Sequence, residues 1–85
     1  MTYAEMISKI NDFLIEDFEV EPSAIIPTAS LKNTLDLDSL DYIDLIVAID
    51  NNFGVKVKPE DFQEMISVEN FYHFIAKKIN TAIPA

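Results

Sequence analysis

Hydrophobic residues recur every three or four positions along most of the chain, which is the spacing of amphipathic α-helices. The first helix begins after Thr2, which forms a T-x-x-E capping box with Glu5, and Ser67 is the expected cap of the last helix. The spacing predicts helices over residues 3–17, 39–53, 59–65 and 68–80. The inward side of the last helix is expected to hold Val68, Phe71, Phe74, Ile75 and Ile79.

Residues 18–37, between the first two predicted helices, form a long connection. Pro22 and Pro27 oppose a long helix there, although a short helical turn fits at residues 22–25. A connection of this length has to be anchored or functional in a small protein. The candidate anchors are Ile25, Ile26, Leu31 and Leu35.

These elements predict an all-α protein. The 85 residues suffice for one domain, residues 1–85, with a simple core. We expect a small four-helix bundle of three longer helices and one short helix, with a long loop between the first and second. A tail follows over residues 81–85.

The predicted helix 39–53 combines acidic and apolar residues in the stretch TLDLDSLDYIDLIVAID, residues 34–50. Asp38 is a good N-cap, and Gly54 is a good residue to follow the last turn. At about 100° per residue, the apolar positions separate into two stripes. One is a core stripe of Tyr42, Leu45, Ile46, Ile49 and Phe53. The other lies beside Ser39 and consists of Leu40, Ile43 and Val47, rimmed by Asp41, Asp44 and Asp50.

An apolar strip with a charged rim is typical of an interaction surface. The alternative is that the short helix 59–65 covers the second stripe and that the acids are merely solvated. Ser39 likewise has two interpretations, since serine is common at helix starts. Its hydroxyl would also be exposed there, where free N–H groups and the helix dipole favour a phosphate.

Charge and composition exclude several classes of function. Fifteen acidic residues against six basic ones give a net charge of −9, which opposes binding to nucleic acid or to an anionic membrane surface. No apolar run approaches the ~20 residues that insertion into a membrane requires. There is no cysteine and no signal-peptide pattern, so the expected location is cytoplasmic.

The sequence predicts neither a catalytic nor a metal site. His73 is the one histidine, and no hydroxyl or thiol stands out as its partner, so we interpret it as a boundary residue. The acids Asp36, Asp38, Asp41 and Asp44 lack the spacing and central glycine of a calcium-binding EF-hand.

Three motifs together resemble the acyl carrier protein family over about residues 3–80. DSLD at 38–41 opens an acidic helix, FG at 53–54 ends it, and KPEDF follows at 58–62. The resemblance implies that a phosphopantetheinyl transferase attaches 4′-phosphopantetheine from coenzyme A to Ser39. The thiol of this arm would carry acyl groups as thioesters, and acyl chains in this family can enter between the second and third helices.

The resemblance also implies that helix 39–53 is a recognition helix. Its acids would meet acyl-transferring and ketosynthase-type enzymes with basic docking patches, in fatty-acid or polyketide-type biosynthesis. Carried over by position, the partner-binding residues are Asp38, Leu40, Asp41, Ile43, Asp44, Val47 and Asp50. We expect the carrier to be a monomer.

The sequence departs from the family in the loop before Ser39. Members usually read L-G-x-D-S-L, whereas this chain reads LDLDSL, with Asp36 in place of glycine and Leu37 in place of a small residue. This favours a specialised carrier of a secondary-metabolite or lipid-modifying pathway. Asp38 and the acidic helix favour an acyl carrier over a peptidyl carrier. A rival from another class is an unmodified acidic helical adaptor.

Overall fold

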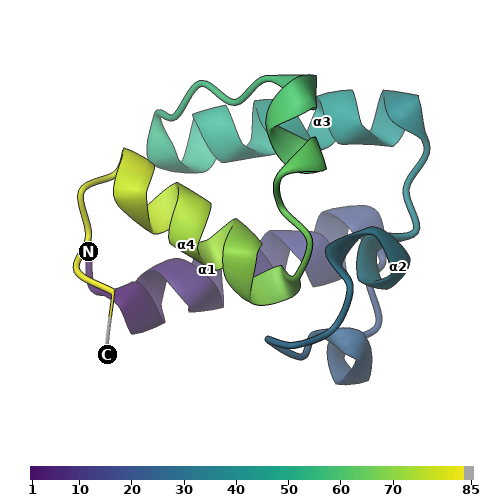
Figure 1. The fold of residues 1–85 in the computed structure, drawn as a ribbon, viewed down its shortest axis with the longest axis horizontal. Coiled ribbons are helices and arrows are strands. Elements are labelled where there is room, and N and C mark those ends of the chain that lie inside the picture. The colour runs from purple at the N-terminus through teal and green to yellow at the C-terminus, as the bar shows by residue number, and fades with distance from the viewer. Residues whose placement is uncertain (84–85) are drawn as a thin grey trace.

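The computed structural model describes residues 1–83, and within that range the chain is helical with no strand. The elements are α1 (Tyr3–Phe18), η1 (Pro22–Ala24), α2 (Leu31–Leu35), α3 (Ser39–Phe53), η2 (Pro59–Gln63) and α4 (Val68–Lys78), where η denotes a 3-10 helix. The predicted small all-α bundle is confirmed (Figure 1).

Local chemistry fixes the start of α1 and the end of α3. The backbone N–H of Glu5 donates to Thr2 Oγ1 at 3.1 Å, and that of Thr2 donates to Glu5 Oε1 at 2.9 Å, so the predicted capping box is confirmed. These hydrogen bonds hold the pKa of the Glu5 carboxyl below its usual value. Gly54 ends α3 with a φ of 67°, in the left-handed region that glycine adopts without strain.

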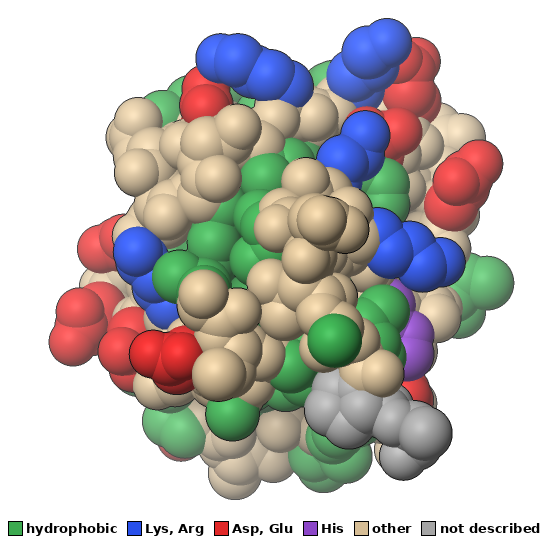
Figure 2. Space-filling view, turned by 90° about the vertical axis from the view of Figure 1, so that its left-hand side faces the viewer, with side chains coloured by type: hydrophobic (Ala, Val, Ile, Leu, Met, Phe, Trp, Pro, Cys, Tyr) green, Lys and Arg blue, Asp and Glu red, His purple; other side chains and the backbone are tan. Residues whose placement is uncertain are grey.

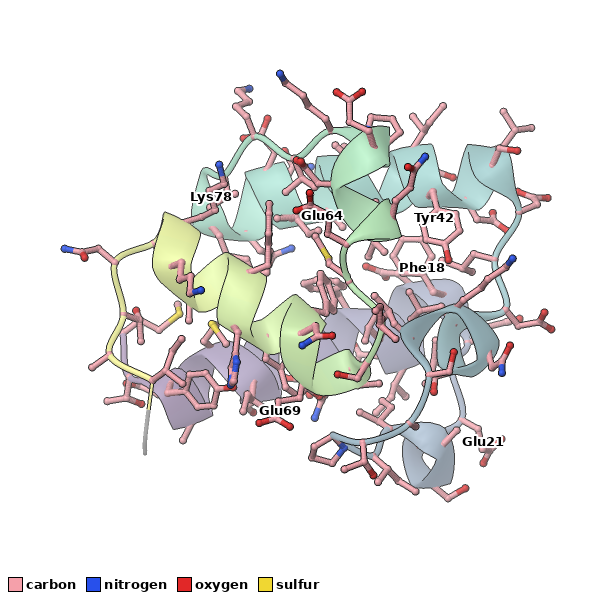
Figure 3. The ribbon with its side chains drawn as sticks, in the orientation of Figure 1. Phe18, Glu21, Tyr42, Glu64, Glu69 and Lys78 are labelled. Atoms are coloured by element: carbon pink, nitrogen blue, oxygen red, sulfur yellow. The ribbon has the colours of Figure 1, made fainter. Side chains whose placement is uncertain are left out.

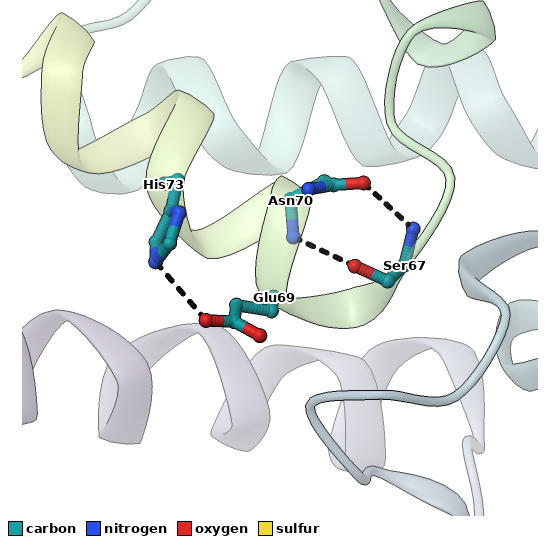
Figure 4. A network of polar contacts seen from close by, with 4 residues as sticks. All are labelled: Ser67, Glu69, Asn70 and His73. Carbon is teal, nitrogen blue, oxygen red and sulfur yellow. Dashed lines mark hydrogen bonds and ion pairs between the residues drawn. The ribbon is translucent and has the colours of Figure 1, made fainter.

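The start of α4 uses the same kind of cap (Figure 4). The N–H of Asn70 donates to Ser67 Oγ at 3.1 Å, and the N–H of Ser67 donates to Asn70 Oδ1 at 3.1 Å. Ser67 is therefore the cap that the sequence predicted. The hydroxyl and the backbone N–H of Ser67 are both hydrogen-bonded within this cap.

The core lies where α1, α3 and α4 meet, with α1 packing on both of the other helices. The most deeply buried large side chains are Met6, Ile10, Leu14, Leu31, Leu45, Ile49, Val68, Phe71 and Ile75. Of the predicted stripes, Tyr42, Ile46, Phe53, Phe74 and Ile79 are only partly buried. Tyr72 is buried instead, and its hydroxyl is satisfied there by donating to Asn11 Oδ1 of α1 at 2.6 Å.

The long connection contains a helix that was not predicted. Leu31 and Leu35 anchor the segment as expected, but they do so from α2, which begins at the cap Ser30. The N–H of Leu31 donates to the Ile66 carbonyl at 2.9 Å, and the N–H of Val68 donates to the Ala29 carbonyl at 3.0 Å. These bonds tie the start of α2 to the start of α4.

Other differences from the predicted elements are small. Ile26 was expected to be an anchor, but it is 50% exposed and contributes little. The short helix expected over 59–65 is the 3-10 helix η2, which packs on α3. The helix expected over 68–80 ends at Lys78, because Asn80 has a positive φ of 59°. Residues 84–85 of the predicted tail lie outside the described range.

Candidate functional site

Ser39 is the first residue of α3, and its side chain is exposed. The preceding residue, Asp38, caps the helix: the backbone N–H of Asp41 donates to Asp38 Oδ1 at 3.0 Å. No hydrogen bond to the Ser39 hydroxyl is found among residues 1–83. The structure thus assigns the capping role to Asp38 and leaves the serine hydroxyl without a structural task.

The other serines at helix starts behave differently. Ser30 Oγ accepts the N–H of Asn33 at 3.4 Å at the start of α2, and Ser67 Oγ accepts the N–H of Asn70 at 3.1 Å at the start of α4. Each of these hydroxyls occupies the N-cap position, whereas Ser39 lies one residue further into its helix. Ser39 is therefore distinguished by position from both capping serines.

The loop before Ser39 explains the unusual LDL sequence. Asp36 follows the last residue of α2 with φ 46° and ψ 47°, the left-handed conformation, and its N–H donates to the Lys32 carbonyl at 2.9 Å. Glycine is the residue that adopts this conformation most easily, and aspartate is one of the few others that tolerate it. The chain therefore keeps a glycine-like backbone at this position without a glycine. Leu37 packs partly buried against the core.

A cavity of about 630 Å³ opens beside Ser39, between α2, α3 and η2. Much of its wall is apolar, and polar side chains lie around it. The lining residues are Ser30, Leu31, Lys32, Ser39, Tyr42, Pro59, Phe62, Gln63, Met65 and Ile66. Its volume is in the range of sites that bind small organic ligands. A flexible group attached to Ser39 would begin at the edge of this cavity.

The second apolar stripe of α3 is exposed. Leu40 is 74% exposed, and Ile43 and Val47 are each 51% exposed. The short helix η2 therefore does not cover it, which answers the alternative raised by the sequence. An exposed apolar strip on an acidic helix is the form of surface that the sequence predicted for partner binding.

A second hollow, of about 380 Å³, adjoins this strip. It brings Asp17 and Phe18 from the end of α1 next to Asp41, Asp44 and Val47 of α3. Sequence reasoning missed Asp17 and Phe18, because nothing in their spacing shows which part of α3 the end of α1 meets. The hollow joins three carboxylates beside apolar side chains, which suits a basic side chain of another protein.

Asp50 differs from the other acids of α3. Its carboxylate Oδ2 lies 2.7 Å from Lys56 Nζ, so its charge is already paired within the chain. Asp44 is exposed and has no ion pair within residues 1–83. Of these two acids, Asp44 is therefore the more available to a partner.

Two lysines, Lys9 and Lys78, lie over aromatic rings at the end of the bundle away from Ser39. Lys9 lies over the ring of Phe53, the last residue of α3, at 5.6 Å from the centroid, and Lys78 lies over Phe74 at 5.4 Å. Figure 2 views that end and shows lysine side chains around an apolar area.

His73 lies half-buried at the edge of α4, as predicted. Its Nε2 is 3.6 Å from Glu69 Oε1, one turn earlier on the same helix (Figure 4), and its ring centroid is 6.1 Å from that of Tyr3. Among residues 1–83, no group of three or more His, Cys, Asp or Glu side chains is arranged to hold a metal ion. In the same range, no helix combines the length and apolarity needed to cross a membrane.

Comparison with known proteins agrees with this geometry. Residues 3–75 match the family model of the phosphopantetheine attachment site. The chain is 30% identical to an acyl carrier protein of Thermosynechococcus vestitus over 79 residues, which cover 93% of this chain and 98% of the relative. It is 30% identical to an acyl carrier protein of Petrotoga mobilis over 80 residues, covering 94% of each. It is 35% identical to acyl carrier protein 2 of Ralstonia nicotianae over 68 residues, covering 80% of this chain and 84% of the relative.

The chain therefore belongs to the acyl carrier protein family, whose members carry a phosphopantetheine attachment domain. Proteins of this family are carriers rather than enzymes, and their cofactor is 4′-phosphopantetheine. The residues present fit that group, because the chain offers an exposed, uncommitted hydroxyl at Ser39 with an apolar cavity beside it.

Proposed function

We propose that residues 1–85 act as one carrier domain in which Ser39 is esterified by 4′-phosphopantetheine. The observation that carries this proposal is the division of labour at the start of α3. Asp38 caps the helix through Asp41, and the Ser39 hydroxyl stays exposed. A hydroxyl that is needed for no hydrogen bond is modified without loss of helix stability.

Attachment needs a separate phosphopantetheinyl transferase and coenzyme A. A bond forms between Ser39 Oγ and the phosphorus of the phosphopantetheine half, while the pyrophosphate bond of coenzyme A breaks and its nucleotide half leaves. The transferase takes the hydroxyl proton. The resulting phosphodiester lies at the N-terminus of α3, where backbone N–H groups and the helix dipole favour an anion. Once attached, the arm supplies the thiol that this cysteine-free chain lacks.

The cavity between α2, α3 and η2 is proposed to shelter the acyl chain. Its apolar wall favours burial of hydrocarbon at roughly 0.8 kcal/mol per methylene group. Because Ser39 lies on its edge, the arm has only to fold back over α3 to bring the chain inside. Burial there would keep the thioester away from water until a partner enzyme draws it out.

The exposed face of α3 is proposed to dock these partners. Its members are Asp38, Leu40, Asp41, Ile43, Asp44, Val47 and Asp50, and we add Asp17 of α1 because it lines the same hollow. The acids would steer basic patches of the transferase and of acyl-transferring and ketosynthase-type enzymes. The exposed apolar side chains would then be covered at the contact.

We propose fatty-acid or polyketide-type biosynthesis in the cytoplasm as the pathway class. The alternative is a specialised carrier of a secondary-metabolite or lipid-modifying pathway. Asp36 keeps the left-handed backbone before Ser39. The unusual LDL sequence is therefore compatible with an attachment loop of ordinary shape. It is for this reason only weak support for a specialised carrier.

The carrier function is tested by loading the chain from acetyl-coenzyme A with a phosphopantetheinyl transferase. Intact-mass measurement should show one acetyl-phosphopantetheine increment. Neutral hydroxylamine should then remove the acetyl group and leave the arm. An unmodified adaptor would gain no mass with any of several transferases. An increment that hydroxylamine leaves unchanged would contradict thioester carriage.

A further inference from the structure

Tyr42 places a hydroxyl-bearing ring in the wall of the cavity beside Ser39. It lies three residues after Ser39, so both side chains project from the same face of α3, with their Cβ atoms about 5–6 Å apart. In Figure 3, Tyr42 extends from α3 toward the side where α2 lies. A group that enters the cavity from Ser39 therefore starts one helical turn from this ring.

The ring of Tyr42 is held by aromatic contacts. Its centroid is 5.1 Å from that of Phe62 in η2, with the planes tilted by 55°. Phe62 in turn lies 6.2 Å from Phe71, which is fully buried in the core. Such contacts fix the position of the phenol rather than letting it swing into solvent. Burial also raises the pKa of Tyr42, so its hydroxyl is a donor at neutral pH.

That hydroxyl has no hydrogen-bond partner among residues 1–83, although the ring is partly buried. Tyr72 shows the contrasting case, because its hydroxyl donates to Asn11 Oδ1 at 2.6 Å. No buried side-chain oxygen or nitrogen among residues 1–83 lacks a partner, so the Tyr42 hydroxyl is still open to solvent and can exchange a water for an acceptor on a bound group. The cavity wall thus carries a donor on a ring held by aromatic contacts, and no acceptor of residues 1–83 occupies it.

We propose that the Tyr42 hydroxyl donates a hydrogen bond to an oxygen on carbon 3 of the acyl cargo. The cavity would then hold 3-hydroxyacyl or 3-oxoacyl chains better than saturated chains of equal length. This rests on the proposed function, because the cargo reaches the cavity from Ser39. An apolar wall with a donor near its entrance fits a chain that is apolar along its length and polar near its attached end. A site that bonds a substrate oxygen discriminates against the analogue that lacks it.

The test compares wild type with Tyr42→Phe, which removes the hydroxyl and keeps the ring. Tyr3→Phe is the matched control, because Tyr3 lies on α1 and does not line the cavity. Each protein is loaded by a phosphopantetheinyl transferase from octanoyl- or 3-hydroxyoctanoyl-coenzyme A. Loading is verified by intact mass and folding by circular dichroism. The readouts are the rate of thioester cleavage by hydroxylamine and the amide chemical shifts of Met65 and Ile66.

We expect Tyr42→Phe to speed cleavage of the 3-hydroxyoctanoyl thioester by roughly 2–10-fold, the equivalent of one ordinary hydrogen bond. The octanoyl thioester should be cleaved at the same rate in wild type and Tyr42→Phe, and Tyr3→Phe should change neither rate. The amide shifts should differ between Tyr42→Phe and wild type with the hydroxylated cargo only.

Equal effects of Tyr42→Phe on both cargoes would overturn the inference, since the hydroxyl would then be acting on the arm and not on the cargo oxygen. No effect on either cargo would overturn it too. Both results would leave the proposed function standing, because the chains would have been loaded. A wild-type chain that takes no arm would overturn the proposed function and this inference with it.

Discussion

The carboxylate of Asp38 accepts a hydrogen bond from the backbone N–H of Asp41, with nitrogen and oxygen 3.0 Å apart. This contact makes Asp38 the N-cap of α3 and frees the adjacent Ser39 from that role. At α2 and α4 a serine does the capping itself. Because α3 is capped by an aspartate and not by a serine, the stability of this helix does not depend on the Ser39 hydroxyl.

Asp38→Ala and Ser39→Ala should therefore differ in stability. Asp38→Ala removes a cap and should lower the free energy of unfolding by about 1 kcal/mol. Ser39→Ala removes an exposed, unbonded hydroxyl and should change it by less than about 0.5 kcal/mol. Urea unfolding followed by circular dichroism measures both. A larger loss for Ser39→Ala would show that the serine, and not the aspartate, caps α3.

Asp36→Gly should stabilise the protein. Asp36 has a φ of 46°, which glycine adopts with less strain. The relief of this strain should exceed the entropic cost of ordering glycine, so the free energy of unfolding should rise by roughly 0.5 kcal/mol. Glu19→Gly is the matched control, because Glu19 ends α1 with a φ of 56°. Thermal unfolding should show a higher midpoint for both variants. A lower midpoint for Asp36→Gly alone would mean that its side chain stabilises the loop.

Asp44→Lys should slow loading by the transferase more than Asp50→Lys does. Asp44 is exposed beside the hollow shared with Asp17, whereas Asp50 already pairs with Lys56 at 2.7 Å. We expect a several-fold slower rate for Asp44→Lys at low salt, with the difference shrinking as salt screens the charges. Initial loading rates at several salt concentrations measure this. Identical rates in both variants, with circular dichroism unchanged, would place the docking face elsewhere.

Alkaline pH should destabilise the fold through Tyr72. Burial raises its pKa above the ordinary value of 10.0, an effect only partly offset by its hydrogen bond with Asn11. The folded chain therefore holds this proton more tightly than the unfolded chain. The stabilisation is complete below the unfolded pKa and is lost as pH rises through the folded pKa. The unfolding free energy of wild type should fall more steeply above pH ~10 than that of Tyr72→Phe. Parallel curves would contradict this origin.

Sequence pattern predicted the helix ends well because local chemistry sets them. Thr2 with Glu5, Ser67, Asp38 and Gly54 each act within one turn of their own position. These features need no knowledge of distant contacts. Helical geometry also placed Leu40 and Val47 in an apolar stripe separate from the core stripe, but their exposure depended on whether residues 59–65 cover them, and only the structure shows that they do not.

Features that depend on tertiary contacts were not predicted. The five-residue helix α2 is too short to show a period, and it is held by burial of Leu31 and Leu35 and by backbone bonds to the start of α4. Its Ser30 cap was readable in principle from the S-x-x-N spacing to Asn33. The pairing of Asp50 with Lys56 depends on how the chain folds back after Gly54.

The most direct test of the central claim is where the arm attaches. Wild type, Ser39→Ala and Ser30→Ala are each incubated with coenzyme A and a phosphopantetheinyl transferase, and their intact masses are measured. Ser30 is a matched control, because it also begins a helix and lines the same cavity but uses its hydroxyl as a cap. Wild type and Ser30→Ala should each gain one phosphopantetheine, and Ser39→Ala should gain none. A modified Ser39→Ala, or a wild type that no transferase modifies, would contradict the assignment of Ser39 as the carrier residue.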